Sequence, residues 1–318
     1  MYRINPGVTR VLGSAIMLVI FAAGCGGAGP AFTTPPIGAV GKMGGANLSI
    51  RSTQKLYVAD NAGNVFVYST GSNPTIMQTI TNGVSKPGGI WVDNGNILYA
   101  VNLPGGSPQT SLPEYKQGAS NPFRTIVNGI VNCEYVAADK QRNVYVAGMA
   151  NDSFFLEIYP KGKLNPAQTL TIPHPAASRL SGLAFDSTGA LLVGESVYIQ
   201  KGVVYRLAPN SHNFTDLNLQ DATGGTISVD RAGNLYVGSG SAAGVQKITV
   251  YPPNSTKPFR KIPVQNILAA FTVDPNGEMY VETSGNGLDE MSVYAPGGNK
   301  PIQTFGIAGG GGGIALSR

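Results

Sequence analysis

The sequence predicts an all-β protein, a six-bladed β-propeller of four-stranded antiparallel blades. The first observation is a unit of about 45 residues that recurs six times across residues 48–318. The second is the content of each unit, in which short β-branched and aromatic runs alternate with turn residues. The third is composition, because 43 Gly, 22 Pro and only 12% charged residues favour short strands and many turns over long helices.

The second strand of each unit is the clearest part of the repeat. It reads Leu-Tyr-Val or a close variant, and successive copies begin 42, 46, 47, 44 and 44 residues apart. The copies occupy residues 56–58, 98–100, 144–146, 191–193, 235–237 and 279–281. A single four-stranded sheet cannot bury both of its faces, so radial stacking of the units supplies the missing core.

The remaining strands are predicted from the residues around this run. In five units it follows a first strand that ends in an aspartate, and that aspartate opens a tight turn. These residues are Asp93, Asp139, Asp186, Asp230 and Asp274. A third strand, with a tyrosine in most units, follows, and an Asn-Pro or Lys-Pro step usually precedes the fourth. Because the turns themselves need aspartate, we interpret the five as turn residues and not as a ring of ligands.

Both ends of the repeat region offer a candidate innermost strand. Residues 48–50 precede the first unit, and residues 314–317 at the C-terminus have the same character, which makes seven candidates for six places. Propellers commonly close when a terminal strand completes the blade at the other end of the chain. We therefore expect residues 314–317 to pair with the first blade.

The N-terminal segment has the layout of a bacterial export signal. Arg3 and Arg10 precede an apolar run over residues 11–23, which is too short to span a bilayer of about 30 Å. We therefore predict a lipoprotein signal peptide over residues 1–24.

The residues that follow predict a membrane anchor and a tether. Residues 22–25, Ala-Ala-Gly-Cys, resemble a lipobox, in which Cys25 would be acylated. The stretch 25–47 would then be the lipidated Cys and a flexible Gly/Pro/Thr tether. We therefore expect the protein at the bacterial cell envelope; with Gly26 and not Asp beside the cysteine, resemblance to sorted lipoproteins implies the outer membrane if the host has one. Cleavage at the same bond without acylation would instead give a secreted protein. The other cysteine, Cys133, is expected to be a small buried side chain.

The charge balance excludes one class of partner. Without Arg3 and Arg10, the 22 basic residues fall to 20 against 17 acidic ones, a net charge of about +3. No basic cluster interleaved with aromatic residues is present, so we expect no nucleic-acid partner.

Several turn and strand segments are shared with known propellers. They read Gly-Asn-Leu-Tyr-Val over residues 233–237 and Gly-Glu-Met-Tyr-Val over residues 277–281, each after an aspartate turn. On these motifs the region 48–318 resembles the six-bladed propellers of the NHL-repeat group and the related gluconolactonase-like (TolB-like) superfamily. The resemblance implies a six-bladed ring. In the gluconolactonase-like enzymes, Glu, Asn and Asp side chains hold a divalent cation near the axis.

Candidate ligand-binding residues come from the loops expected at the mouth of the central channel. They are Asp60, Asn102, Glu134, Arg179 and Glu195, among positions that are mostly Gly, Ala, Ser or Thr. By analogy with the gluconolactonase-like enzymes, Asp60, Asn102, Glu134 and Glu195 could form a cation site only if the loops brought them together, since calcium needs six to eight oxygens. We expect no metal and no cofactor, and interpret these residues as solvated loop groups.

The two histidines are predicted to be surface loop residues. His174 falls between a fourth and a first strand, and His212 falls between a third and a fourth strand. These connections lie on opposite faces of a propeller, so the two imidazoles cannot share a zinc ion or a catalytic centre.

Together these features favour a binding or protein-interaction scaffold anchored at the cell envelope. The partner would be a protein, a polysaccharide or a small ligand at the channel mouth, and we expect a monomer. One alternative is a divalent-metal-dependent lactonase or lyase of the gluconolactonase-like type. Another is a structural surface component without a specific ligand. The sequence favours a non-enzyme without deciding the question.

Overall fold

The computed structural model divides the chain into two compact units, Met1–Ala46 and Asn47–Arg318. It describes residues 54–103, 110–175, 178–197, 202–222, 224–239, 246–285 and 288–317. The predicted signal peptide, Cys25, the tether and the strand candidate at residues 48–50 lie outside these ranges. No helix among the described residues is long and apolar enough to cross a membrane. The described elements are all β-strands.

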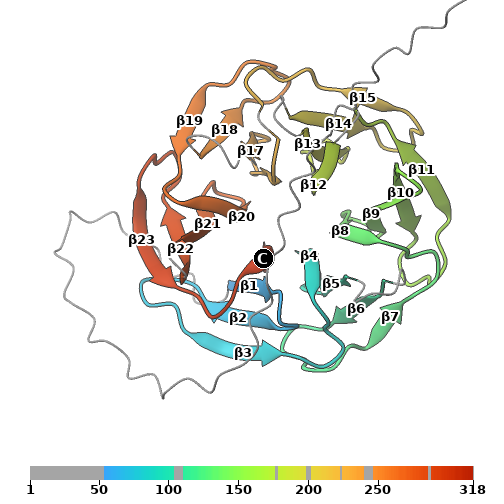
Figure 1. The fold of residues 1–318 in the computed structure, drawn as a ribbon, viewed down its shortest axis with the longest axis horizontal. Helices are drawn as coiled ribbons and strands as arrows, with labels where there is room; N and C mark the ends of the chain where they lie inside the picture. Colours follow the sequence, from blue (N-terminus) through green and yellow to red (C-terminus); the bar gives the residue numbers. More distant parts are fainter. Residues whose placement is uncertain are drawn as a thin grey trace, which may run out of the picture. The chain divides into compact units, whose positions relative to one another are not determined.

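The strands form six four-stranded antiparallel sheets set as blades around one axis, as predicted (Figure 1). From the innermost strand outward, blade 1 consists of β24 (Gly311–Leu316), β1 (Lys55–Asp60), β2 (Val65–Ser69) and β3 (Ile76–Ile80). Blade 2 consists of β4 (Pro87–Val92), β5 (Leu98–Asn102), β6 (Leu112–Tyr115) and β7 (Arg124–Ile126). Blade 3 consists of β8 (Cys133–Ala138), β9 (Val144–Ala150), β10 (Ser153–Tyr159) and β11 (Gln168–Ile172).

The second half of the ring repeats this order. Blade 4 consists of β12 (Ser178–Phe185), β13 (Leu191–Val197), β14 (Val203–Leu207) and β15 (Phe214–Asp216). Blade 5 consists of β16 (Ile227–Val229), β17 (Leu235–Gly238), β18 (Lys247–Tyr251) and β19 (Arg260–Pro263). Blade 6 consists of β20 (Ile267–Val273), β21 (Met279–Gly285), β22 (Leu288–Tyr294) and β23 (Pro301–Gly306).

The ring is closed by the C-terminal strand, which confirms the expectation for residues 314–317. Strand β24 pairs antiparallel with β1, and Leu316 lies opposite Leu56 while Ile314 lies opposite Val58. Blade 1 therefore takes its innermost strand from the C-terminus and its outer three strands from the beginning of the repeat region.

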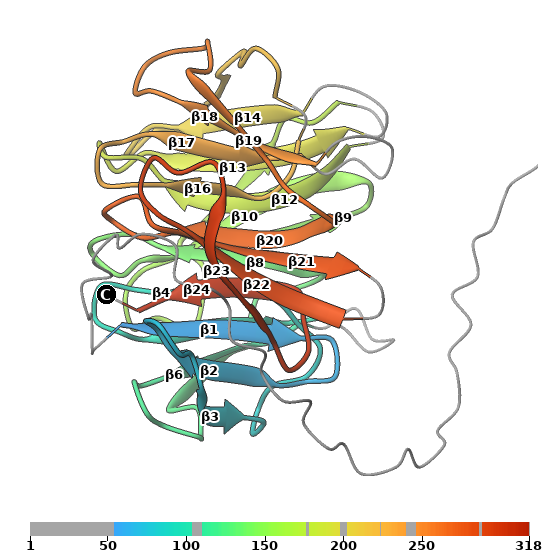
Figure 2. The ribbon, with the colours of Figure 1, turned by 90° about the vertical axis from the view of Figure 1, so that its left-hand side faces the viewer.

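The strands run between two faces of the ring (Figure 2). We call upper the face on which the innermost strands begin and the second strands end, and lower the face that carries the five aspartate turns. Because adjacent strands are antiparallel, the connections between successive blades lie on the upper face. This is the face on which the predicted channel-mouth residues lie.

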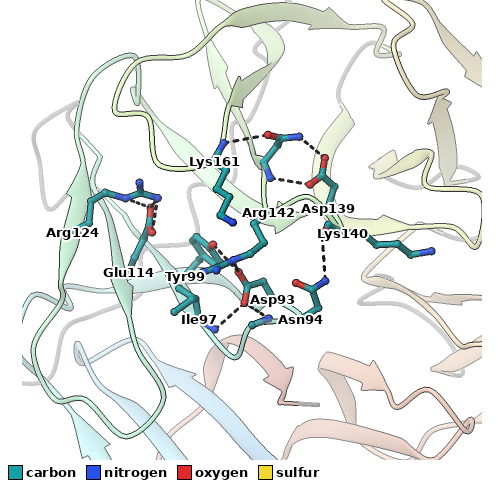
Figure 3. Close-up of polar contacts among 12 residues, drawn as sticks. Asp93, Asn94, Ile97, Tyr99, Glu114, Arg124, Asp139, Lys140, Arg142 and Lys161 are labelled. Atoms are coloured by element: carbon teal, nitrogen blue, oxygen red, sulfur yellow. Dashed lines mark hydrogen bonds and ion pairs between the residues drawn. The ribbon is translucent and has the colours of Figure 1, made fainter.

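The aspartate turns of the lower face confirm their structural interpretation (Figure 3). Asp93 is buried, and its Oδ1 accepts hydrogen bonds from the backbone N–H groups of Gly95 at 2.8 Å and Ile97 at 2.9 Å. Its Oδ2 accepts from the Tyr99 hydroxyl at 3.0 Å and from Nε of Arg142 at 2.7 Å. The other four aspartates accept backbone N–H groups within their own turns in the same way.

The tyrosines of the third strands fasten neighbouring blades together. Tyr115 in blade 2 donates a hydrogen bond of 2.8 Å to the carbonyl of Asn82, which follows the last strand of blade 1. Three other blades repeat this link to the connection before them, through Tyr159 to the Asn128 carbonyl, Tyr251 to the Gln220 carbonyl and the Ala308 N–H to Tyr68. The recurring tyrosine is therefore a blade-to-blade tie as well as a core residue.

The core lies between the blades. Tyr236 and Val250 of blade 5, for example, pack with Phe271 and Val281 of blade 6, and all four side chains are buried. Cys133 is also buried and free, as predicted, and desolvation raises the pKa of its thiol. Burial of these apolar groups is the main term that holds the ring together.

Glycines let the innermost strands of blades 1 to 3 approach closely. A Cβ at Gly313 would lie 2.8 Å from the backbone nitrogen of Ile90, and one at Gly89 would lie 2.9 Å from the Glu134 carbonyl oxygen. Such distances leave no room for a side chain. In the sequence analysis, several of these glycines were only small residues at the channel mouth. The structure shows that they allow the backbones of neighbouring blades to come into contact.

Candidate functional site

Asp60 ends strand β1 on the upper face and closes a turn of its own. Its Oδ1 accepts from the N–H groups of Ala62 at 3.1 Å and Asn64 at 2.7 Å. Its Oδ2 accepts from the Asn64 side-chain amide at 2.8 Å. This buried carboxylate thus has the same local role as the aspartates of the lower face.

Asn102 ends strand β5 and holds the connection that leads into blade 2. Its Oδ1 accepts from the Ser85 N–H at 2.8 Å, and its amide group donates to the Gly83 carbonyl at 2.8 Å and to the Ser111 hydroxyl at 2.9 Å. Because these bonds occupy the amide group of the buried side chain, Asn102 has a structural role and not a ligand-binding one.

Glu134 and Arg179 form a pair of opposite charges on the upper face. Each is the second residue of an innermost strand, β8 for the glutamate and β12 for the arginine, and both side chains are exposed. Desolvation nevertheless raises the pKa of Glu134, while the positive charge of Arg179 acts in the opposite direction. Because both side chains are exposed on the upper face, a bound molecule could reach both charges.

Glu195 is fully buried near the upper end of strand β13. Its exposed fraction is 0%, and neither carboxylate oxygen has a hydrogen-bond partner. Desolvation raises its pKa to about 7, and the nearby Ser178 hydroxyl offsets part of this shift without reaching hydrogen-bonding geometry. Strands β12 and β14 place Leu180 and Val203 opposite it. Glu195 is therefore a buried acid and not a solvated loop charge, which corrects the expectation from sequence.

The structure therefore brings together only part of the predicted set. Glu134 and Arg179 act on each other, whereas Asp60, Asn102 and Glu195 are occupied or buried in their own blades. Among the residues that the structure describes, no three His, Cys, Asp or Glu side chains are grouped so as to hold a metal ion.

The histidines lie where the sequence predicted. His174, in the connection between β11 and β12 on the upper face, stacks against Phe154 with ring centroids 4.7 Å apart. His212 lies in the β14–β15 loop on the lower face. The two imidazoles cannot act on one substrate.

Glu282 is a residue that sequence reasoning missed as a site. It follows the Met-Tyr-Val run of β21, at a place where the other five blades have Ala or Val or Gly. The side chain has an exposed fraction of 0%, and its Oε2 has no hydrogen-bond partner. A glutamate at an otherwise small, apolar position of the repeat is the signal that could have revealed it.

A pocket of about 210 Å³ lies away from all of these groups. It opens between blades 3 and 4 and is lined by residues that include Tyr145, Pro160, Phe185 and Pro209, near the lower face. Pockets for small ligands usually measure about 300–1,000 Å³. Its small volume and its distance from the charged pair make it a weaker candidate than the upper face.

Comparison with known proteins supports the fold but identifies no activity. No family model matches the sequence, and no curated protein matches it. A protein of unknown function from Bacteroides caccae is similar at TM-score 0.60 and 14% identity, over 83% of this chain and 99% of that one. A functionally unknown protein from Desulfotomaculum acetoxidans has TM-score 0.55 and 16% identity, over 80% of each chain.

A third similar structure is the WD40 β-propeller domain of Doa1, at TM-score 0.55 and 10% identity over 80% of each chain. At such identities the likeness establishes the β-propeller fold alone.

Proposed function

We propose that the protein is an exported, lipid-anchored β-propeller that acts as a binding scaffold at the cell envelope, and that its partner docks on the upper face around Glu134 and Arg179. The fold supports a scaffold, because a rigid ring presents loops in fixed positions. The proposed kinship with NHL-repeat and gluconolactonase-like propellers rests on the strand motifs. The proposed anchor rests on the Ala-Ala-Gly-Cys sequence before Gly26.

The observation that carries the proposal is the exposed pair of opposite charges. Glu134 and Arg179 lie on neighbouring innermost strands, so a partner can accept hydrogen bonds from the guanidinium and donate to the carboxylate at the same time. Exposed apolar side chains adjoin the pair. Val131 precedes β8, and Met149 is joined to the same segment by a hydrogen bond from its N–H to the Asn132 carbonyl at 3.2 Å.

This mixture of charge and exposed apolar surface suits a polar partner such as a protein or a polysaccharide. Arginine, methionine and other adaptable side chains are enriched at interfaces. The charges would set orientation and specificity, and the apolar groups would add contact area.

The test is binding to defined envelope components by purified protein. Isolated cell-wall polysaccharide and solubilised envelope proteins are each titrated with wild type, Glu134→Lys and Arg179→Glu. We expect at least a tenfold loss of affinity in both variants, since each converts attraction into repulsion at the pair. Lys261→Glu, at a half-exposed residue of blade 5 paired with Asp221, changes charge equally and serves as the control.

Unchanged affinity in both variants, for a component that wild type binds, would remove the upper-face pair from the proposal. Failure of wild type to bind any component would count against the scaffold itself.

The anchor is tested separately by fractionation of cells that express wild type or Cys25→Ser. We expect the wild-type protein in the membrane fraction and the variant in the soluble fraction, because several acyl chains acting together would supply the membrane affinity that the variant lacks. If the variant remains with the membrane, the lipid anchor is wrong even if the scaffold proposal stands.

A further inference from the structure

A glycine-rich connection crosses the seam at which the ring closes. It joins β23 of blade 6 to β24 of blade 1, and the five successive glycines at residues 309–313 form its end and the first three residues of β24. A Cβ at Gly309 would lie 3.0 Å from Oδ2 of Asp60. One at Gly310 would contact Oε1 of Glu282 and would lie 3.3 Å from the carboxyl carbon of Asp289. Three carboxylates from blades 1 and 6 thus converge on two adjacent glycines.

Among these three carboxylates, Glu282 has an oxygen that lacks a hydrogen-bond partner. Its Oε1 accepts a hydrogen bond of 2.6 Å from the Gly311 N–H, whereas its buried Oε2 has no partner. Desolvation, and then the negative charge of Asp289, raises its pKa to about 7. Among the described ion pairs, none includes Glu282 or Asp289. An unpartnered buried carboxyl group costs stability whether it is charged or protonated.

We propose that Glu282 and Asp289 bind a divalent cation, Ca²⁺, at the seam between blades 6 and 1. Carbonyl groups of the glycine connection and water would complete the coordination. A cation there would satisfy Oε2 of Glu282 and neutralise the convergence of negative charge that Asp60 increases. This site was not predicted from the sequence, which led us to expect no metal.

Calcium suits the donors better than other cations do. It takes six to eight oxygen ligands in flexible geometry, and carboxylates, carbonyl groups and water all serve. Magnesium requires a near-octahedral arrangement that a glycine connection does not impose. With two carboxylate ligands, and no three His, Cys, Asp or Glu side chains placed to hold a metal ion together among the described residues, the affinity should be weak. Dissociation constants of about 10⁻⁴–10⁻³ M are typical of extracellular calcium modules.

The site would act on ring closure. Glu282 lies on β21 and Asp289 on β22 in blade 6, while the glycines lead directly into β24, the strand that completes blade 1. Calcium would therefore tie the last blade to the first at the one seam where the two ends of the repeat region meet.

The experiment uses the purified full-length protein, freed of metal with a chelator that is then removed. Tb³⁺ is added and its luminescence is excited through tyrosine, because the Tyr68 hydroxyl accepts a hydrogen bond of 2.7 Å from the Ala308 N–H beside the site. We expect sensitised emission that Ca²⁺ displaces at lower concentration than Mg²⁺. A tenfold excess of Ca²⁺ over its dissociation constant should also raise the melting temperature by about 3 °C.

Glu282→Gln and Asp289→Asn should each abolish the emission and the calcium-dependent rise in melting temperature. Asp289 is partly exposed, so its variant keeps the test valid if Glu282→Gln does not fold. Glu195→Gln is the matched control, since it alters another fully buried glutamate whose carboxylate oxygens lack partners, at a place away from the glycine connection. The control should respond to calcium as wild type does. Absence of a calcium effect in wild type, or its persistence in Asp289→Asn and Glu282→Gln, would overturn the proposal.

Discussion

Glu195 should make the protein less stable as pH rises through neutrality. Its carboxyl group has a pKa of about 7 in the folded protein against an ordinary value of 4.5. The difference of about 2.5 units corresponds to about 3 kcal/mol of unfolding free energy. The carboxyl has an exposed fraction of 0%, so solvent does not screen this effect appreciably.

The sign follows from proton binding. Between pH 4.5 and about 7 the folded state holds the proton of Glu195 more tightly than the unfolded state does. Stability contributed by this residue is therefore undiminished below pH 4.5, falls as pH rises, and reaches its full loss above about pH 7.5. Glu195→Gln cannot titrate, so the difference in unfolding free energy between the variant and wild type should shift in favour of the variant by about 3 kcal/mol across this range.

The assay is urea denaturation of both proteins at several pH values between 4.5 and 8, in the presence of chelator. Comparison at each pH cancels the titration of all other groups. Glu290→Gln, at a partly exposed glutamate of β22, is the control for the replacement of a glutamate by glutamine. A difference between Glu195→Gln and wild type that stays constant over the whole range would refute the reasoning.

Three further predictions concern the structural roles assigned above, and urea denaturation of the variants tests each of them. Tyr115→Phe removes one partly buried hydrogen bond between blades and should cost about 1 kcal/mol, and a negligible loss would mean that the link contributes no stability. Gly313→Ala places a Cβ 2.8 Å from the backbone of blade 2 and should cost about 1–3 kcal/mol, whereas Gly306→Ala meets nothing within 4 Å and should be nearly neutral. Asp93→Asn weakens a buried ion pair and should cost about 2 kcal/mol, more than Asp186→Asn, whose carboxylate is partly exposed, and equal losses would contradict the role of burial.

Features that depend on neighbouring residues could be predicted from the sequence. The turn at Asp93 is made by bonds to residues two and four positions away, so its role is visible in the local pattern. The strands are short alternating runs bounded by such turns, and their recurrence determined the number of blades. The same recurrence gave seven candidate innermost strands for six blades and led us to expect residues 314–317 beside blade 1, where the structure places them.

The tertiary structure alone decided which candidate side chains meet. Asn102 and Asp60 look like ligands in a sequence, but their bonds to backbone groups in turns and connections commit them to structure. Glu134 and Arg179 are 45 positions apart, and only the packing of adjacent innermost strands brings their charges within reach of each other.

The seam between blades 6 and 1 shows most clearly which contacts the sequence alone could not predict. Asp60 and Gly309 lie almost at opposite ends of the propeller sequence, yet they are in contact, and Glu282 joins them from a different sheet. The sequence by itself determined the repeat, because each turn and strand is stabilised within a few residues. The convergence of acids at the seam depends on closing the whole ring, and no local pattern contains that information.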